Sequence, residues 1–110
     1  MAAVQEVTDA TFEQEVIQSP QLVLVDFWSP ACPACVALAP ILDKLAGEMA
    51  DYVKFLKLNV FEHQATTAKY GIQSIPSLLI FKGGKVLANL VGFKPEHEIR
   101  RHLLSAIRAA

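Results

Sequence analysis

The segment LVLVDFW, residues 22–28, is apolar at both odd and even positions except for Asp26. A strand with one face in water alternates apolar and polar side chains, whereas a strand covered on both faces is apolar throughout. The segment therefore predicts a central strand, deep in a sheet with helices on both sides. This places the chain in the α/β fold class.

The next segments predict a helix and a second strand. Residues 33–49 carry apolar side chains at helical spacing, and Pro40 is expected to bend this helix because it interrupts the hydrogen-bond pattern. The spaced apolar side chains are Leu38, Leu42, Leu45 and Met49. Residues 53–60 predict a strand, and the order strand, helix, strand predicts that the two strands are parallel neighbours.

The second half of the chain predicts an edge hairpin. A helix over residues 63–70 is expected to end at Gly71, and residues 75–81 predict another strand. The sequence KGGK, residues 82–85, is a two-glycine turn, which makes residues 77–91 an antiparallel hairpin at the edge of the sheet.

Two more helices are expected near the ends of the chain. Thr8 and Asp9 are suitable caps for a short helix that stops at Pro20. Pro95 is expected to open the last helix, with four apolar side chains inward and three arginines in solvent. The inward set is Ile99, Leu103, Leu104 and Ile107, and the arginines are Arg100, Arg101 and Arg108.

Length and charge narrow the class of protein. The 110 residues are 53% apolar, which is enough for one core, so residues 1–110 are expected to form a single domain. Lys and Arg total 10 against 11 for Asp and Glu, with no basic run, which argues against a nucleic-acid partner. The acidic N-terminus and the short apolar runs argue against a signal peptide and a membrane span, so a cytoplasmic protein is expected. The small charged exterior predicts a monomer.

Both cysteines, Cys32 and Cys35, lie where the first strand ends and the long helix begins. This places Cys32 at or beside the helix N-cap, with Pro33 at the first helical position. The free amides and the positive end of the helix dipole stabilise a thiolate there. Cys35 follows one turn later and nearer the interior, a spacing at which a disulfide can close. Because cytoplasmic thiols stay reduced, such a pair is more often catalytic or metal-binding than structural.

A zinc site and chance proximity are the alternatives to a redox pair. A Cys-x-x-Cys unit is half of a structural zinc site, which needs about two further ligands. No second cysteine pair exists, and the remaining candidate ligands are His63, His97 and His102, so no metal site is predicted. In the second alternative, the two cysteines are small buried apolar residues that lie close by chance.

The chain resembles the thioredoxin family. The Cys-x-x-Cys between strand and helix matches, and the match extends from about residue 5 to 107. The other matching pieces are VDFW (25–28), APILDKLA (39–46), KFLKLNV (54–60), KYGIQSIPSLLIFKGGKV (69–86) and Val91-Gly92. The resemblance implies a central mixed sheet flanked by four α-helices and a protein dithiol–disulfide oxidoreductase. It also implies that no cofactor is bound and that electrons come from NADPH through a thioredoxin reductase.

The resemblance also assigns roles to individual residues. It implies that Cys32 attacks the client disulfide, that Cys35 resolves the mixed disulfide, and that the product is a Cys32–Cys35 disulfide. Asp26 matches the buried carboxylate of the family. Burial penalises an ionised carboxylate, so the pKa of Asp26 is expected to rise and make it a proton acceptor for Cys35. The alternative is a structural ion pair between Asp26 and the matching Lys57 on the neighbouring strand.

A substrate groove is implied beside the cysteines. In the family the bond matching Ile75-Pro76 is cis and lies against the active site, and X-Pro is the bond type that tolerates cis. With Trp28, Val91 and Gly92 these residues would form an apolar groove for an extended client segment. The ordinary alternatives are a trans proline that starts a strand, a core tryptophan and a turn glycine.

The active site departs from the family pattern. The usual Trp-Cys-Gly-Pro-Cys-Lys is replaced by Ala-Cys-Pro-Ala-Cys-Val. Ala34 replaces the proline that precedes the second cysteine in the family, so this position regains a backbone N–H. That N–H is expected to point at the attacking sulfur, stabilise its thiolate and make the pair more oxidising. Pro33 removes another amide and Val36 removes a cation, but the expected net direction is still oxidising. Ala31 replaces the family's tryptophan and removes a large contact surface beside Cys32, so the choice of reductase and client proteins is expected to differ from that of the family.

These departures motivate a second hypothesis from another class. In it, the chain is a thioredoxin-like binding module or chaperone subunit that holds a protein partner in the apolar groove without redox turnover. The oxidoreductase hypothesis is preferred because both cysteines, Asp26 and the Ile75-Pro76 pair are all present.

Overall fold

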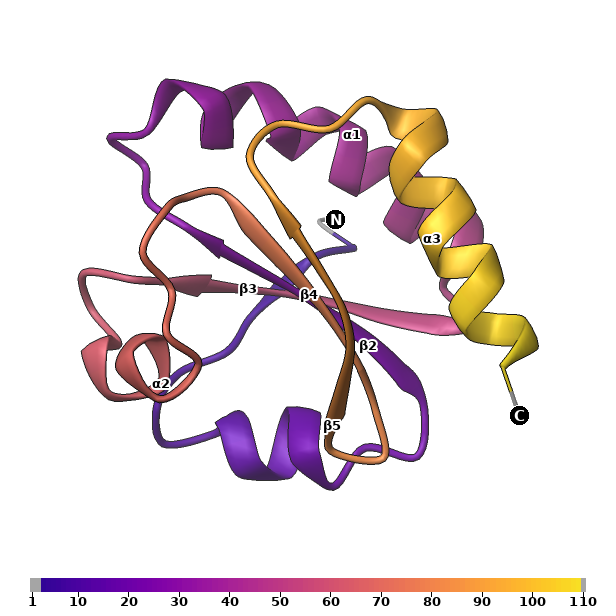
Figure 1. Cartoon of the computed structure of the whole chain (residues 1–110), viewed down its shortest axis with the longest axis horizontal. Helices are drawn as coiled ribbons and strands as arrows, with labels where there is room; N and C mark the ends of the chain where they lie inside the picture. Colours follow the sequence, from indigo (N-terminus) through magenta and orange to yellow (C-terminus); the bar gives the residue numbers. More distant parts are fainter. Residues whose placement is uncertain (1–2, 110) are drawn as a thin grey trace.

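The computed structural model describes residues 3–109, which form a five-stranded sheet with four helices (Figure 1). The elements are β1 (Gln5–Glu6), the short π-helix η1 (Glu13–Ile17), β2 (Leu22–Trp28), α1 (Pro33–Met49), β3 (Val53–Asn59), α2 (Gln64–Lys69), β4 (Ser77–Lys82), β5 (Lys85–Val91) and α3 (Glu96–Arg108). The strand order is β1-β3-β2-β4-β5. Strands β1, β2 and β3 are parallel, whereas β4 is antiparallel to β2 and β5. The predicted mixed sheet with β2 at its centre and a hairpin at one edge is confirmed.

Strand β2 divides its side chains between two apolar layers. Leu22 and Leu24 join the cluster under α1 and α3, which lie on one side of the sheet in Figure 1. Val23, Val25 and Phe27 join the cluster under η1 and α2 on the other side. Because side chains alternate along a strand, Asp26 has the parity of Leu24 and faces α1. Asp26, the one charged residue of β2, therefore points toward α1, the helix that begins beside the cysteines.

The N-terminal segment differs from its prediction. It contains the two-residue strand β1, which was not predicted, and its helix begins at Glu13 instead of near Thr8. Asp9 does not cap that helix. Its carboxylate accepts the N–H groups of Thr66 (2.9 Å) and Ala65 (3.4 Å) and so caps α2, whose first-turn amides lack partners within the helix. The cap is supplied from a distant part of the chain.

The last helix also departs from its prediction in detail. Ile99 and Leu103 are buried as expected, but Leu104 is 39% exposed. A residue adjacent to Leu103 is turned by about 100° around the helix, so the inward stripe continues at Ala106 instead. Arg100 is not a free solvent group, because its guanidinium pairs with Glu48 and Glu96, at 2.6 and 2.8 Å.

The other predicted helices and strands are present with small shifts in their bounds, and the predicted bend at Pro40 stays a prediction. Helix α1 continues through Pro40, and the turn between β4 and β5 contains Gly83 and Gly84 at positive φ. Strand β4 begins at Ser77, two residues later than predicted. Within residues 3–109 there is no helix with the length and apolar character needed to cross a membrane.

Candidate active site

The two cysteines lie at the start of α1, as predicted. Cys32 is the N-cap residue, Pro33 occupies the first turn, and the Cys32 sulfur accepts the backbone N–H of Cys35 at 3.2 Å. Cys32 is half-buried, whereas Cys35 is only 1% exposed. Both are free thiols, so the structure describes the reduced pair. Only Cys32 is placed to meet a sulfur that arrives from solvent.

The amide expected from Ala34 is not the one that reaches the sulfur. Among the described residues, the backbone donor to the Cys32 sulfur is Cys35. An N-cap side chain bonds the second or third amide of its helix, and here it selects the third, which belongs to Cys35. Ala34 therefore makes no hydrogen bond to the Cys32 sulfur, and the reason given for a more oxidising potential is absent.

Ser29 holds the loop that carries Cys32 and was missed in the sequence. It is 1% exposed, and its hydroxyl accepts the N–H of Ala31 at 3.2 Å. Its carbonyl accepts the N–H of Cys32, also at 3.2 Å. The available signal was a serine before a proline at the end of a strand, a pattern that favours such side-chain turns.

Asp26 is buried beneath the cysteines without a direct ion pair. Its side chain is 4% exposed, and burial raises its pKa to about 7, against the opposing effect of the positive charge on Lys57. Lys57 faces Asp26 in the register of β2 and β3. Its ammonium group, however, lies over the ring of Trp28, 4.8 Å from the centroid, and no Asp26–Lys57 ion pair forms within residues 3–109. One carboxylate oxygen, Oδ1, has no hydrogen-bond partner in the described chain.

Asp26 and Cys35 share one cavity of about 50 Å³. Its other lining residues are Val4, Trp28, Ala39, Leu42, Asp43 and Lys57. A water molecule needs roughly 10–15 Å³, so the space is sufficient for a water that links the carboxylate to the thiol. Burial and the hydrogen bond to Cys32 raise the pKa of the Cys35 thiol, which therefore needs a base to become a nucleophile.

Ile75, Pro76 and Gly92, three of the residues predicted to bind substrate, are linked by backbone contacts that reach Cys32. The Ile75-Pro76 bond is cis, and the thiol of Cys32 donates to the Ile75 carbonyl at 3.8 Å. Gly92 has a φ of 90° and donates its N–H to the carbonyl of Pro76 at 2.8 Å. Val91, which precedes it, is 49% exposed.

Trp28 and Pro40 lie differently from these groove residues. Trp28 is half-buried and lines the cavity with Asp26. Pro40 is exposed on α1, about 10 Å along the helix from Pro33, and does not line the cavity. The structure therefore does not bring Pro40 to the reacting groups.

Replacing Lys57 by glutamine is expected to raise the pKa of Asp26 above about 7. The positive charge of Lys57 is the effect that opposes burial, and its removal leaves burial uncompensated. The carboxyl carbon of Asp26, followed by NMR as pH is varied, reports the change. Lys54→Gln is the matched control, since Lys54 lies on the same strand but pairs with Glu15 at 2.8 Å. An unchanged or lowered Asp26 pKa in Lys57→Gln would contradict the assigned role of Lys57.

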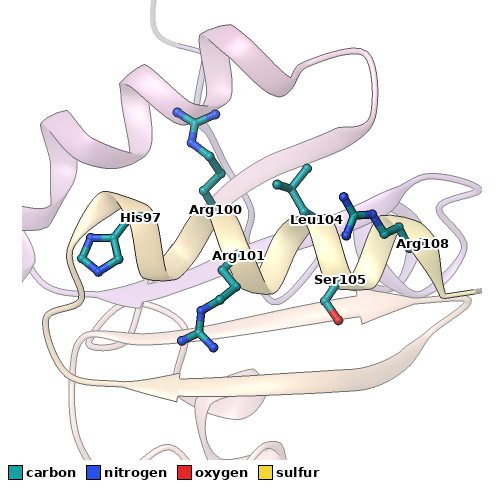
Figure 2. Close-up of a pocket in the computed structure, with 6 residues that line it drawn as sticks. All are labelled: His97, Arg100, Arg101, Leu104, Ser105 and Arg108. Atoms are coloured by element: carbon teal, nitrogen blue, oxygen red, sulfur yellow. The ribbon is translucent and has the colours of Figure 1, made fainter.

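Another depression, of about 370 Å³, lies along α3 (Figure 2). Its lining residues are His97, Arg100, Arg101, Leu104, Ser105 and Arg108. In Figure 2, Arg100 extends toward α1, where Glu48 holds it, and Arg101 extends from the other side of the helix. No cysteine lines this surface, so it is separate from the thiol chemistry. Within residues 3–109, no three His, Cys, Asp or Glu side chains are grouped so as to hold a metal ion.

Comparison with known proteins agrees with this geometry. The thioredoxin family model matches residues 3–105. The thioredoxin of Haemophilus influenzae is 46% identical over 99 residues, covering 90% of this chain and 92% of that protein. The thioredoxin of Bacillus subtilis is 44% identical over 98 residues, covering 89% and 92%. A chloroplastic M-type thioredoxin of Chlamydomonas reinhardtii is 44% identical over 93 residues, covering 84% and 66%.

These relatives match over nearly their full length in two of the three cases, and the cysteine pair lies within the matched region. The non-catalytic binding module is accordingly not favoured. The chain belongs to the thioredoxin family and is a thiol–disulfide oxidoreductase that acts on protein disulfides.

Proposed function

We propose that this oxidoreductase works in the reducing direction in the cytoplasm, with Cys32 as the attacking thiol and Cys35 as the resolving thiol. Its electrons come from NADPH through a thioredoxin reductase. The observation that carries the assignment of the two thiols is their unequal burial: Cys32 is half-buried beside the Ile75 carbonyl, and Cys35 is 1% exposed. A client sulfur therefore reaches Cys32 first.

The first step forms a mixed disulfide. The Cys32 thiolate attacks one sulfur of the client disulfide, the client S–S bond breaks, and the other client sulfur leaves as a thiolate that takes up a proton. The hydrogen bond from the Cys35 amide and the helix N-terminus stabilise the negative charge on Cys32 before the attack.

The second step releases the client. Asp26 accepts the proton of the Cys35 thiol, through a water in their shared cavity, and the Cys35 thiolate attacks the Cys32 sulfur. The bond between Cys32 and the client breaks, the client sulfur leaves as a thiolate and is protonated, and a Cys32–Cys35 disulfide remains. A carboxylate with a pKa of about 7 suits this task, because it accepts and returns protons near neutral pH. The client gains two electrons, which the reductase restores to the pair from NADPH.

The proposal is tested by a coupled assay with insulin, NADPH and a bacterial thioredoxin reductase. Consumption of NADPH that depends on both the reductase and this protein supports it. If dithiothreitol drives insulin reduction but the reductase does not, the proposed electron source is wrong.

The redox midpoint of the cysteine pair tests the proposed direction. We expect a midpoint near about −270 mV in glutathione and dithiothreitol buffers, because Ala34 donates no hydrogen bond to the Cys32 sulfur and Val36 supplies no charge. A midpoint above about −230 mV would overturn the reducing direction and indicate an exchange or oxidising catalyst.

A further inference from the structure

Large exposed apolar side chains gather at the end of the sheet that carries Cys32. The exposed fractions are 67% for Phe61, 54% for Val36, 49% for Val91 and 47% for Phe93. They come from separate segments: the loop after β3, the first turns of α1, and the end of β5 with the loop that follows it. Single exposed apolar residues are normal on a protein surface, but a cluster at one place marks an interaction site.

The backbone of Phe61 is fixed beside the end of β2. Asn59 and Trp28 are partners in the register of β3 and β2, and Val60 donates its N–H to the Trp28 carbonyl at 2.9 Å. Phe61 donates its own N–H to the side chain of Asn59 at 3.0 Å. An ordered backbone thus presents a phenyl ring to solvent one strand away from the strand that leads to Cys32.

Phe93 is placed on the opposite side of Cys32. It follows Gly92, whose N–H donates to the Pro76 carbonyl at 2.8 Å, and Val91 pairs with Ser77 at the start of β4. In the order β3-β2-β4-β5, the loops that carry the two phenylalanines are three strand spacings apart, about 14 Å. Figure 1 shows the ends of β2 and β3 and the start of β4 on the same side of the molecule. An extended chain covers about 14 Å with roughly four residues.

We propose that Phe61 and Phe93 select client segments that carry an aromatic or branched aliphatic residue on each side of the cysteine. The inference rests on the proposed function, in which the client sulfur must reach Cys32. A bound client segment then lies across the strand ends, and its side chains cover the two phenyl rings. Such residues are mostly buried in folded proteins, so the favoured substrates are disulfides in unfolded or partly folded chains.

In an extended segment, the residues two positions before and two positions after the cysteine lie about 14 Å apart, and their side chains share the face of the cysteine side chain. The test compares two peptide disulfides that differ only at these two positions, phenylalanine in one and serine in the other. The protein is reduced beforehand, and the second-order rate constant of the reaction is followed through Trp28, the only tryptophan in the sequence. We expect the phenylalanine peptide to react about tenfold faster, equal to about 1.4 kcal/mol. Because no reductase is present, the result does not depend on the proposed electron source.

Variants identify the residues responsible. Phe61→Ala and Phe93→Ala are each expected to lower the preference to about threefold, the square root of tenfold, and the double variant to abolish it. Tyr52→Ala is the matched control, since Tyr52 is 64% exposed but lies before β3, at the opposite end of that strand. Glutathione disulfide, which is too small to span the two rings, is expected to react equally with all variants.

Two outcomes would overturn the inference: equal rates for both peptides with the unaltered protein, or a double variant that keeps the tenfold preference. Failure of the unaltered protein to reduce either peptide or glutathione disulfide would instead overturn the proposed function, and the inference with it.

Discussion

Replacing Cys32 by serine reduces disulfide turnover to the rate of the uncatalysed exchange, whereas replacing Cys35 by serine traps the client as a mixed disulfide. Serine at position 32 supplies no thiolate, and the remaining thiol of Cys35 is too buried, at 1% exposure, to reach a client sulfur. Serine at position 35 leaves the first attack intact, because Cys32 still accepts the backbone N–H of residue 35. It removes only the sulfur that would release the client.

The two variants are compared with insulin as the client. Turnover is measured by insulin precipitation, and the trapped complex by mass spectrometry without reductant. Ala37→Ser, at an exposed position of α1, controls for adding a hydroxyl to this helix and should keep full turnover. Reduction of insulin by Cys32→Ser, or a client bonded to Cys35 in the unaltered protein, would contradict the assigned order of attack.

The local pattern of apolar and polar residues was sufficient to predict most of the fold. The apolar run of β2, interrupted only by Asp26, predicted burial on both faces, and the helical spacing of α1 predicted which of its side chains are buried. The position of Asp26 within β2 also determines that it faces α1, since side chains alternate along a strand. The cis bond before Pro76 could be expected only from the family resemblance, because most X-Pro bonds are trans.

The missed features depend on contacts between segments that are distant in sequence. Asp9 resembles a local cap but caps α2, because that helix lies beside it in space. The parallel pairing of β2 and β3 was predicted, but the pattern could not show that Lys57 extends over Trp28 and forms no ion pair with Asp26. The sequence also could not predict that Phe61 is exposed, since an aromatic residue after a strand is more often part of the core.

The largest pH effect on stability is expected at Asp26. Its pKa is about 7 in the folded protein and 3.8 in the unfolded chain, so between these values the folded state binds more protons. The free energy of unfolding therefore falls as pH rises through this window and stays low above it. The difference in pKa, at about 1.4 kcal/mol per pH unit, corresponds to a cost of about 4 kcal/mol above pH 7.

Asp26→Asn removes this cost. At about pH 8 the free energy of unfolding of this variant is expected to be about 2–4 kcal/mol higher than that of the unaltered reduced protein. The lower figure allows for burying an amide without partners. At about pH 4 the folded form of each protein carries a neutral side chain at this position, so most of the gain disappears. Urea unfolding of the reduced proteins at both pH values measures it.

Asp9→Asn provides a control of opposite sign. Hydrogen bonds from Thr66 and Ala65 lower the pKa of Asp9, so its contribution to stability is present above the unfolded pKa and is lost as pH falls through the folded one. This variant should be less stable than the unaltered protein at neutral pH. A gain in Asp26→Asn that is equal at both pH values would show that packing, not charge, is responsible. The predicted dependence on pH would instead show that the fold retains an unfavourable carboxylate beneath Cys35, and the same variant should then release trapped clients more slowly near pH 7.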